Sequence, residues 1–426
     1  MQSERRKTTY RLYPKPRQAE ALEEQRRLHQ RLYNALLEQR IDAYRKQRVS
    51  LNFAAQCREI TALRRELPEY KALHAHSQQV TAKRVDLAFR AFFRRVKEGA
   101  RRAGFPRFKS IARYPGFGYK AHGDGWRLDT GAGGKHGHMR IKGVGNVRLR
   151  GKARFEGTPK TCEIKLKNGR WYASVTFAVT PVAVARFVSP HAHGRAIGLD
   201  WGVETFATVA EAQERAPGLV NTYDVDNPRH GRVHRQRLTR LAREVSRKKR
   251  GSSNRKKAVA HLAKAHRKLA NIRHDFLHQT SNRLVGRAEA IVTEKLHISN
   301  MTRSAKGTIE KPGKNVRQKG GLNREILDTA PDLFLQMLRY KAEEAGIAYL
   351  EVSTKAHAPS QTCHGCGRRV KKILAQRRHR CECGAECGRD ENAARVLAGL
   401  WGREPALCGG IPLGVPMKQE TPSKVA

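Results

Sequence analysis

The stretch RAIGLDWGVETFATVA (195–210) decides the fold of the second half of the chain. Its apolar start predicts a buried strand that ends at an acidic residue, Asp200. A carboxylate at the end of a buried strand needs a cation or several hydrogen-bond donors, because losing water around the charge is costly. AEAIVTEKL (288–296) repeats this pattern and ends in Glu294. We therefore expect two buried strands that each present an acid at the same edge of a sheet.

A third acid opens a predicted helix. GRDENAARVLA (388–398) puts Asp390 at the start of that helix, where the helix dipole favours the ionised carboxylate. Each acid has an ordinary explanation when taken alone: a turn residue for Asp200, a surface ion pair for Glu294 and a helix cap for Asp390. Converging carboxylates would repel one another, and two hard divalent cations would relieve that repulsion. Such a pair can activate water and stabilise the leaving oxygen when a phosphodiester is cut.

The overall charge indicates the partner. The chain has 426 residues, with 86 Lys and Arg against 38 Asp and Glu, for a formal net charge of +48. This excess repels itself unless an anionic partner neutralises it. We find no apolar run of about 18 residues that would span a membrane, and the N-terminus MQSERRKTTYR lacks the apolar core of a secretory signal. Nucleic acid is the partner that fits, although a ribosomal-type packing protein or an Arg-rich genome is the plain alternative.

The positive charge is concentrated in residues 229–273, which hold seventeen Lys or Arg and one acid, Glu244. Leucines recur there at helical spacing, which predicts two long helices separated near 251–254. A solvated helix face normally mixes charges, so a face that is almost all positive favours binding to phosphates. The candidate nucleic-acid-binding residues lie around the break: Arg247, Lys248, Lys249, Arg250, Lys256 and Lys257.

Five of the eight cysteines lie between Cys363 and Cys387, which indicates a metal cluster in a reducing compartment and not a disulfide framework. CHGC (363–366) is followed by fourteen residues and then by CEC (381–383). This spacing predicts a zinc ribbon. The predicted ligands are Cys363, Cys366, Cys381 and Cys383, with Cys387 or His379 as alternatives to Cys381. We expect the ribbon to be structural and to hold the chain in place before Asp390, with direct DNA contact as the alternative. No second His-containing metal site is predicted.

The first half predicts helices and a small β domain. A basic strand is expected over 4–14, followed by helices over 17–47, over a stretch ending at Pro68, and over about 75–102. Residues 110–180 predict the β domain, with strands around 125–129, 138–141 and 146–149 and a hairpin over 163–179. Asn168-Gly169 is typical of a type I′ hairpin turn. The remaining segments predict a linker over 181–195, a mobile loop over 299–324, a helix over 325–346, a strand over 347–354 and a disordered tail from about 402.

Three motifs resemble those of a known family. In this order, GLDWGVETFAT (198–208), VTEKL (292–296) and GRDENAA (388–394) resemble the motifs of the RuvC-like nuclease domain in the TnpB family. That family is transposon-encoded, and type V CRISPR effectors are thought to descend from it. Further blocks resemble the family in the same order: YRLYPKPRQ (10–18), GFPRFK (104–109), LNREILDTAPDLFLQMLRYKAEEAG (322–346) and PSQTCHGCG (359–367). The resemblance covers about residues 1–400.

The resemblance implies a set of site residues. The catalytic acids of the family correspond to Asp200, Glu294 and Asp390, which would hold Mg (or Mn). Arg389 and Asn392 match the third motif and would support the metal site or the phosphate, with a purely structural role equally open. The chain departs from the family at the second cysteine pair, where one residue separates the two cysteines.

The resemblance also implies a multidomain fold of α+β and α/β type. It consists of a β-barrel wedge domain (1–10 and 106–182), a helical recognition domain (11–105), an RNase H-like (RuvC) nuclease domain (183–354 and 388–403), an inserted zinc ribbon (355–387) and a disordered tail (404–426).

The function implied is that of an RNA-guided DNA endonuclease that cuts by metal-dependent hydrolysis next to a short target-adjacent motif. Its partners would be a guide RNA and double- and single-stranded target DNA, with no membrane and a monomer bound to RNA. It would act in the cytoplasm of a prokaryote and lie on the nucleoid when bound to DNA. The alternatives are a compact type V CRISPR effector with the same chemistry, a guided DNA-binding repressor that does not cut, and a general nucleic-acid chaperone.

Overall fold

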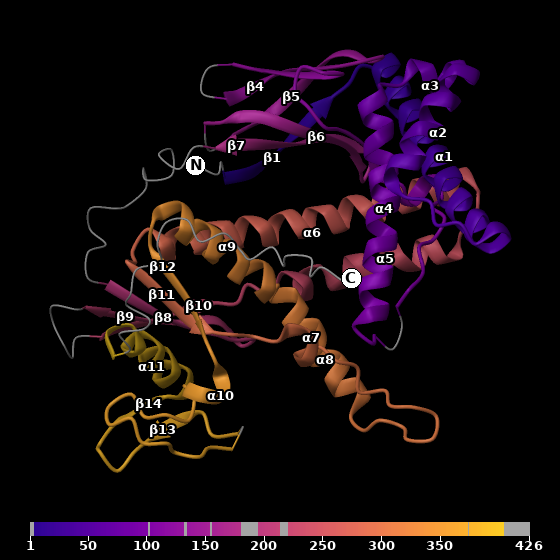
Figure 1. Cartoon of the computed structure of the whole chain (residues 1–426). Helices are drawn as coiled ribbons and strands as arrows, with labels where there is room; N and C mark the ends of the chain where they lie inside the picture. Colours follow the sequence, from indigo (N-terminus) through magenta and orange to yellow (C-terminus); the bar gives the residue numbers. More distant parts are fainter. Residues whose placement is uncertain are drawn as a thin grey trace, which may run out of the picture. The chain divides into compact units, whose positions relative to one another are not determined.

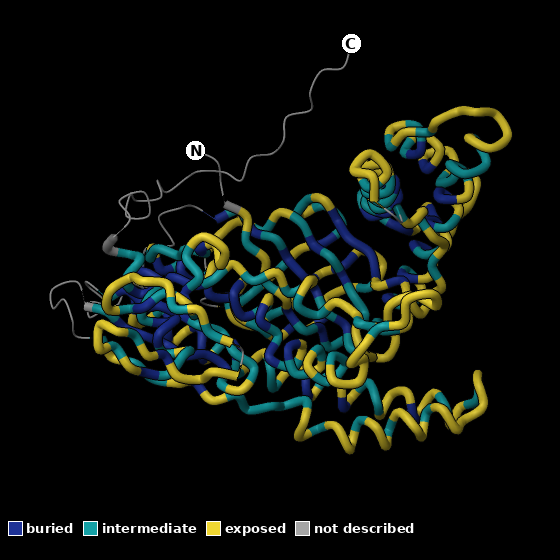
Figure 2. The backbone as a smooth tube through the Cα atoms, turned by 90° about the horizontal axis from the view of Figure 1, so that it is seen from below, coloured by how far each residue is buried: buried dark blue, intermediate teal, exposed yellow. Residues whose placement is uncertain are grey.

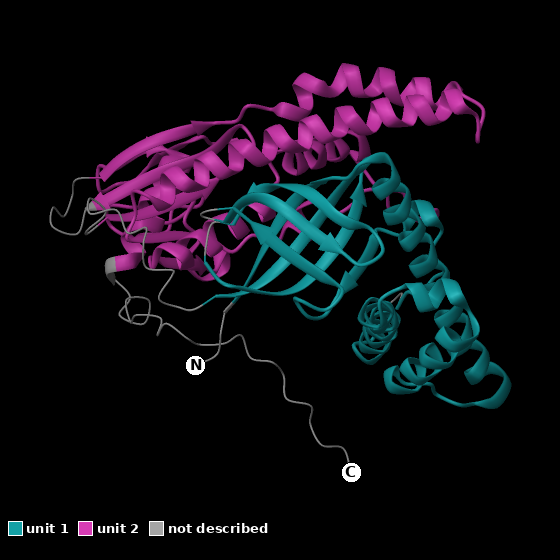
Figure 3. Ribbon diagram, turned by 90° about the horizontal axis from the view of Figure 1, so that it is seen from above, with its two compact units in different colours: residues 1–183 teal, residues 184–426 magenta. Residues whose placement is uncertain are grey.

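The computed structural model describes residues 4–100, 103–131, 134–153, 156–179, 195–213, 220–373 and 375–403. The chain divides into two units, residues 1–183 and 184–426, which Figure 3 colours separately. Among the described residues, no helix has the length and apolarity needed to cross a membrane. The predicted tail over 404–426 and all but the last residue of the predicted linker over 181–195 lie outside the described residues.

An antiparallel sheet of seven strands forms the core of the first unit, in the order β2-β6-β7-β1-β5-β4-β3. The strands are β1 (Glu4–Tyr13), β2 (Gly116–Tyr119), β3 (Trp126–Thr130), β4 (Lys135–Ile141), β5 (Gly145–Lys152), β6 (Thr158–Lys167) and β7 (Arg170–Val179). Asn168 and Gly169 both have positive φ, as the predicted hairpin turn requires. All the predicted strands are confirmed, and β2 is an addition. The described residues show no pairing of β2 with β3, so closure into a barrel stays a prediction.

Helices make the rest of the first unit. They are α1 (Pro16–Gln47), α2 (Phe53–Glu66), α3 (Pro68–Ala72) and α4 (Ala75–Lys97), followed by a 3₁₀ turn (Ile111–Arg113). The apolar row of α1 with Leu32 and Leu36 packs on Val85 and Phe89 of α4, as helical spacing predicts. Pro68 does not only end a helical stretch; it also begins α3, because a proline at the first helical position has no hydrogen bond to lose.

The second unit contains a five-stranded sheet in the order β10-β9-β8-β11-β12. Its strands are β8 (Arg195–Trp201), β9 (Thr205–Gln213), β10 (Val220–Asp226), β11 (Ala290–Glu294) and β12 (Ala348–Val352). β8, β11 and β12 run parallel, whereas β9 and β10 are antiparallel to their neighbours. The strands β8, β11 and β12 were predicted from their apolar runs, whereas β9 and β10 were not predicted as separate strands.

Successive residues of a strand point to opposite faces, and each face of this sheet has its own cover. On one face, Ile197 and Leu199 pack against α6 (Ser253–Val285) and α9 (Pro331–Ala345). On the other face, Ala210 packs against α11 (Arg389–Arg403). Figure 1 shows α11 on the opposite side of the sheet from α6 and α9, and Figure 2 colours each described residue by its burial.

The remaining elements join these layers. They are α5 (His230–Arg247), α7 (Ile298–Met301), α8 (Val316–Thr329), α10 (Thr354–His357), β13 (Arg378–Arg380) and β14 (Glu386–Gly388). α5 and α6 confirm the two predicted basic helices. The predicted loop over 299–324 is wrong for 299–301, which lie in α7, and for 316–324, which lie in α8. The Asn323 side chain of α8 donates to the Thr302 carbonyl (2.9 Å). The single helix predicted over 325–346 is broken at Ala330, which has a positive φ of 48°.

Candidate active site and metal centre

Two parallel strands bring the first two acids together. β8 and β11 pair in parallel with Leu199 opposite Thr293, so the next residue of each strand, Asp200 and Glu294, follows at the same edge of the sheet. Thr293 is buried and its hydroxyl donates to the Leu199 carbonyl (3.1 Å), which fixes the register just before the acids. Both predicted strand-end carboxylates therefore lie side by side.

Gly198 lets the third acid reach them. A Cβ built on Gly198 would overlap the carbonyl oxygen of Ala394 and the backbone nitrogen of Ala398 in α11. Because glycine has no Cβ, the backbone of α11 lies directly against β8. Asp390 is the second residue of α11, so this close packing holds it beside the end of β8. The sequence predicted the helix and the strand, but it contained no signal that Gly198 joins them.

The three acids affect one another electrostatically. Loss of solvent raises the pKa of Asp200 well above its ordinary value, and the negative charges of Glu294 and Asp390 raise it further. Burial also raises the pKa of Glu294. The Arg389 guanidinium opposes both shifts, so it lies within electrostatic reach of the pair. Arg389 offsets only part of the negative charge, since the pKa values of Asp200 and Glu294 stay raised, and this oxygen donor set suits a hard divalent cation.

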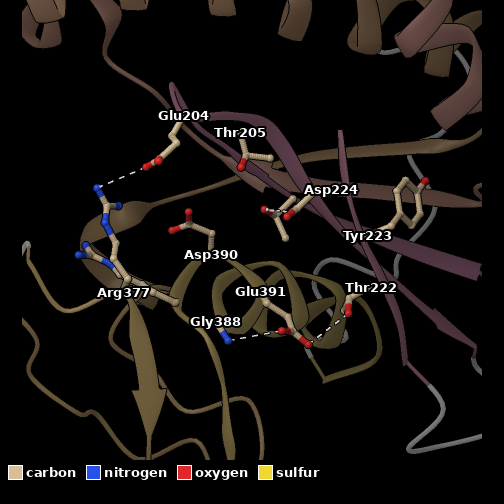
Figure 4. A pocket seen from close by; sticks show the side chains of 11 residues that line it. Glu204, Thr205, Thr222, Tyr223, Asp224, Arg377, Gly388, Asp390 and Glu391 are labelled. Carbon is tan, nitrogen blue, oxygen red and sulfur yellow. Dashed lines mark hydrogen bonds and ion pairs between the residues drawn. The ribbon is translucent and has the colours of Figure 1, made fainter. Parts of the chain in front are cut away.

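A fourth acid continues the row across the sheet. Thr208 of β9 pairs with Asp200 on one side and with Asp224 of β10 on the other, so the three side chains share one face. The Thr208 hydroxyl donates to Asp224 Oδ1 (2.6 Å). Asp224 and Asp390 both line a pocket of about 510 Å³, shown in Figure 4. Asp224 was not predicted as a site residue because β10 was not predicted as a strand.

Glu391 fixes the first turn of α11 beside this pocket. Its carboxylate accepts hydrogen bonds from the Thr222 hydroxyl (3.1 Å) and from Arg395 (2.6 Å), and it lies 3.4 Å from the Gly388 backbone nitrogen. Figure 4 shows Glu391 turned toward β10 and Asp390 turned into the pocket. Asn392, which the family motif suggested as a support residue, points elsewhere: its partners all lie in residues 359–364.

The predicted zinc ligands form one cluster. The sulfurs of Cys363, Cys366, Cys381 and Cys383 lie within 4.8 Å of one another. The Cys363–Cys383 and Cys366–Cys381 sulfur distances are both 3.6 Å. Tetrahedral zinc, with bonds of about 2.3 Å, separates neighbouring sulfurs by roughly 3.8 Å. The cluster therefore has the donors and the spacing to hold a zinc ion.

The two alternative ligands lie beside this cluster. Cys387 is buried, with its sulfur 3.8 Å from His364 Nδ1, and it does not belong to the group of four sulfurs. His379 is fully buried and groups with Cys363 and His364. Cys381 therefore completes the four-sulfur group, as the preferred assignment expected.

A group of two histidines and one acid, which was not predicted from the sequence, lies in the first unit. His74 and His76 contact the two carboxylate oxygens of Asp124, each at 2.7 Å. However, His74 Nδ1 accepts from the His76 backbone N–H (3.3 Å), so in the neutral ring the proton is on Nε2, which faces Asp124. We therefore interpret the His74 contact as a hydrogen bond from Nε2 to Asp124, which ties the 121–125 turn to the residue that precedes α4.

The predicted nucleic-acid-binding residues surround the turn between α5 and α6. All six side chains are exposed: Arg247, Lys248, Lys249, Arg250, Lys256 and Lys257. The positive end of the α6 dipole disfavours cations, yet the first turn of α6 contains no acid that would offset the basic residues there. A groove of about 780 Å³ along α5 has Arg240, Arg243 and Arg247 in its lining. This local excess of charge is unfavourable for folding, and an anionic partner would relieve it.

Comparisons with known proteins agree on one family. Residues 179–305 match a family model described as "Probable transposase", and residues 332–397 match one described as "Cas12f1-like, TNB domain". A relative named RNA-guided DNA endonuclease InsQ, from Escherichia coli (strain K12), is 34% identical over 345 residues, which is 80% of this chain and 78% of the relative. A relative of the same description from Streptomyces pristinaespiralis is 28% identical over 421 residues, or 96% and 92% of the two chains.

The fold has a counterpart among solved structures. The chain superposes on Cas12f1 from a complex with sgRNA and target DNA with a TM-score of 0.56 at 12% identity, covering 95% of this chain and 99% of that one. At this identity the match shows a shared mixed α/β fold alone. The identity and coverage of the Escherichia coli relative carry the family assignment. The chain belongs to the TnpB family, to which these proteins named RNA-guided DNA endonucleases also belong.

Proposed function

We propose that this protein is an RNA-guided DNA endonuclease of the TnpB type, which cuts DNA by divalent-metal-dependent hydrolysis next to a short target-adjacent motif. The observation that carries the proposal is the convergence of Asp200, Glu294 and Asp390 from two parallel strand ends and one helix start. Membership of the TnpB family supports the guided activity.

The three carboxylates would hold Mg (or Mn) at this edge of the sheet. A bound divalent cation supplies an activated water and stabilises the leaving oxygen of a phosphodiester. Asp200 and Glu294 have raised pKa values, so a cation would favour the ionised carboxylates that serve as its ligands. Arg389 acts in the same direction and lines the pocket together with Asp390, where it would also contact a phosphate.

The cysteine cluster would hold zinc and act as a structural centre. Its four sulfurs lie within 4.8 Å of one another, and β14 ends at Gly388, directly before α11 begins. The ribbon over 355–387 would thus be inserted in an RNase H-like nuclease domain made of 183–354 and 388–403. The mixed five-stranded sheet with helices on both faces supports that domain type.

The first unit would recognise nucleic acid. We assign a β-barrel wedge domain to 1–10 and 106–182 and a helical recognition domain to 11–105, which together would hold guide RNA and read the target-adjacent motif. The basic hairpin of α5 and α6 would contact the guide–target duplex through the exposed Lys and Arg at its turn. The protein would act as a monomer with RNA in a prokaryotic cytoplasm, a setting that bacterial relatives support.

A purification with co-expressed RNA tests this proposal. The bound RNA is sequenced, and the complex is then given DNA that matches the RNA together with Mg. We expect a discrete RNA and Mg-dependent cutting of matched DNA only. Asp390→Ala should abolish cutting and keep the RNA, whereas Asp332→Ala, the second residue of α9 and an exposed acid, should cut normally. Absence of a discrete RNA, or normal cutting by Asp390→Ala, would contradict the proposal.

A compact type V CRISPR effector is the second candidate function. The fold match to Cas12f1 favours it, and the chemistry would be the same. The neighbouring DNA distinguishes the two, because transposon ends indicate a transposon protein and a repeat array indicates a CRISPR effector. A guided repressor without cutting would not need the three acids to converge.

A further inference from the structure

We propose that Asn392 is a positioning residue that couples the metal state of the cysteine cluster to the carboxylate site. This inference rests on the proposed function, since it assumes that the carboxylates bind a divalent cation. Asn392 lies on α11 two residues after Asp390, and its side chain is fully buried.

All four hydrogen bonds of the Asn392 amide go to the chain that enters the cysteine cluster. Oδ1 accepts from the His364 backbone nitrogen (3.1 Å) and lies 3.0 Å from His364 Nδ1. Nδ2 donates to the carbonyls of Pro359 (3.1 Å) and Thr362 (2.7 Å). The amide is therefore saturated by residues 359–364, and no hydrogen bond is left for the carboxylates or for a phosphate.

These partners are adjacent to the metal ligands. Thr362 directly precedes Cys363, and His364 lies between Cys363 and Cys366. His364 is held from a second side, because its Nε2 is 3.4 Å from Arg395 Nη1 of α11. The turn over 363–366, which carries two of the four sulfurs, is thus held against α11, the helix that carries Asp390.

The other side of α11 is fastened to the sheet. Glu391 accepts from Thr222 of β10, and Gly198 receives the backbone of α11. Asp390 is therefore followed by Glu391, which is anchored to the sheet, and by Asn392, which is anchored to the ribbon. If the ribbon anchor loosens, only the contacts with the sheet still hold the first turn of α11.

The ribbon depends on its metal for order more than the sheet does. Its strands β13 and β14 have three residues each, and among its sulfurs Cys366 and Cys383 are exposed. Such a segment has little apolar core, so a bound ion supplies most of its cohesion. Loss of the ion would free residues 359–364, and the Asn392 amide would carry the change to Asp390.

The chemistry of an amide explains why asparagine serves here. The site offers two donors from His364 and two carbonyl acceptors, and only an amide has both an acceptor oxygen and two N–H donors. Aspartate would keep the bonds to His364 but turn a carboxylate oxygen toward two carbonyls. Alanine would remove all four of these contacts, although Pro359 is buried and Thr362 and His364 are half-buried.

The test measures Mn²⁺ binding to the full-length protein by electron paramagnetic resonance. Wild type and Asn392→Ala are compared with the cluster loaded with zinc and after zinc has been stripped and the chelator removed. We expect Asn392→Ala to raise the Mn²⁺ Kd about tenfold in the loaded protein, within the usual range for coupled sites. Stripping should raise the Kd of wild type by a similar factor and add little in the variant.

Linkage supplies a second readout. Coupling between two binding sites is reciprocal, so bound Mn²⁺ should slow the loss of zinc from the wild-type protein. The same effect should be absent in Asn392→Ala. The loss of zinc is followed with a chromophoric zinc chelator that binds Mn²⁺ weakly. A role in folding alone would lower the amount of Mn²⁺ bound at saturation and leave the Kd unchanged. If the Kd of Asn392→Ala matches wild type, or if stripping weakens both proteins equally, the coupling is wrong.

Two further variants keep the test decisive. His364→Ala retains the cysteines and the backbone partners of Asn392, so it should shift the Kd in the same direction by a smaller factor, and an unchanged Kd contradicts the proposal even if Asn392→Ala does not fold. Arg368→Ala is the control, because this exposed ribbon residue pairs with Glu382 and should leave the Kd unchanged. The binding test uses no guide or DNA, so failure of guided cutting would refute the proposed function while zinc-dependent Mn²⁺ binding would still support the coupling.

Discussion

The carboxylate site and the cysteine cluster are both candidate metal centres, but the fold supports them in opposite ways. Asp200 and Glu294 end strands of a buried sheet, and Asp390 begins a helix packed on that sheet. The sheet therefore holds these acids together despite their mutual repulsion. The four cysteines lie in or beside turns next to two strands of three residues each, where the ligands themselves have to hold the segment together. This difference in support fits the proposed roles, in which the carboxylates would carry out the chemistry and the cysteine cluster would stabilise its segment.

Removing one acid should give the largest effect. Glu294→Gln keeps the shape of the side chain and removes its charge, so we expect guided DNA cutting to fall by about three orders of magnitude or more. Thermal stability should hold or increase, because burial raises the pKa of Glu294 and ionisation is unfavourable there. Cleavage rates at saturating guide, with a melting curve, check both. A loss of cutting accompanied by unfolding would contradict the proposed difference between the two centres, since the acid would then be structural.

Removing one thiolate should lower stability and reduce cutting only in part. In Cys363→Ser we expect bound zinc to fall from one ion per chain to well below one, with lower stability of the ribbon. Cutting should fall by roughly 10- to 100-fold, the usual cost of disturbing the support of a metal site. Zinc counting by mass spectrometry, together with cleavage rates, tests this. One full zinc per chain in the variant would remove Cys363 from the ligand set.

The sequence predicted the parts of both centres that depend on local pattern. Apolar runs located β8 and β11 with their terminal acids, and cysteine spacing located the ribbon. The edge strand β10 was missed because VNTYDVD is largely polar and becomes a strand through pairing with β9. Asp224 was missed with it. The roles of Gly198 and Asn392 depend on packing between segments far apart in the chain, which the local pattern of a single sequence does not encode.

The basic hairpin should contribute affinity and no chemistry. Replacing Lys248 and Lys249 by Gln should weaken nucleic-acid binding and reduce the salt dependence of log K by about 0.9 for each phosphate that the protein no longer neutralises. The cutting rate at saturating nucleic acid should stay within about twofold of wild type. Binding curves at several salt concentrations measure the slope. An unchanged slope would remove these two residues from the interface.

A smaller effect should appear in the stability of the metal-free protein. The folded-state pKa of Asp200 is raised by loss of solvent and by Glu294 and Asp390, so its contribution to stability is present at low pH and lost as pH rises through that pKa. Asp200→Asn should thus match wild type near pH 4 and melt a few degrees higher near pH 8, at about 2–4 °C per kcal/mol. Melting curves across this pH range test the sign. A lower Tm at pH 8 would contradict it.

The central claim, that Asp200, Glu294 and Asp390 form one site, is tested most directly by combining variants. Cutting rates and Mn²⁺ binding are measured for Asp200→Ala, for Asp390→Ala and for the double variant, each with its guide RNA. A single site predicts that each single variant already loses nearly all cutting and high-affinity Mn²⁺ binding, so that the double variant is no worse. Independent, multiplying losses, or Mn²⁺ binding like wild type in either single variant, would contradict the claim.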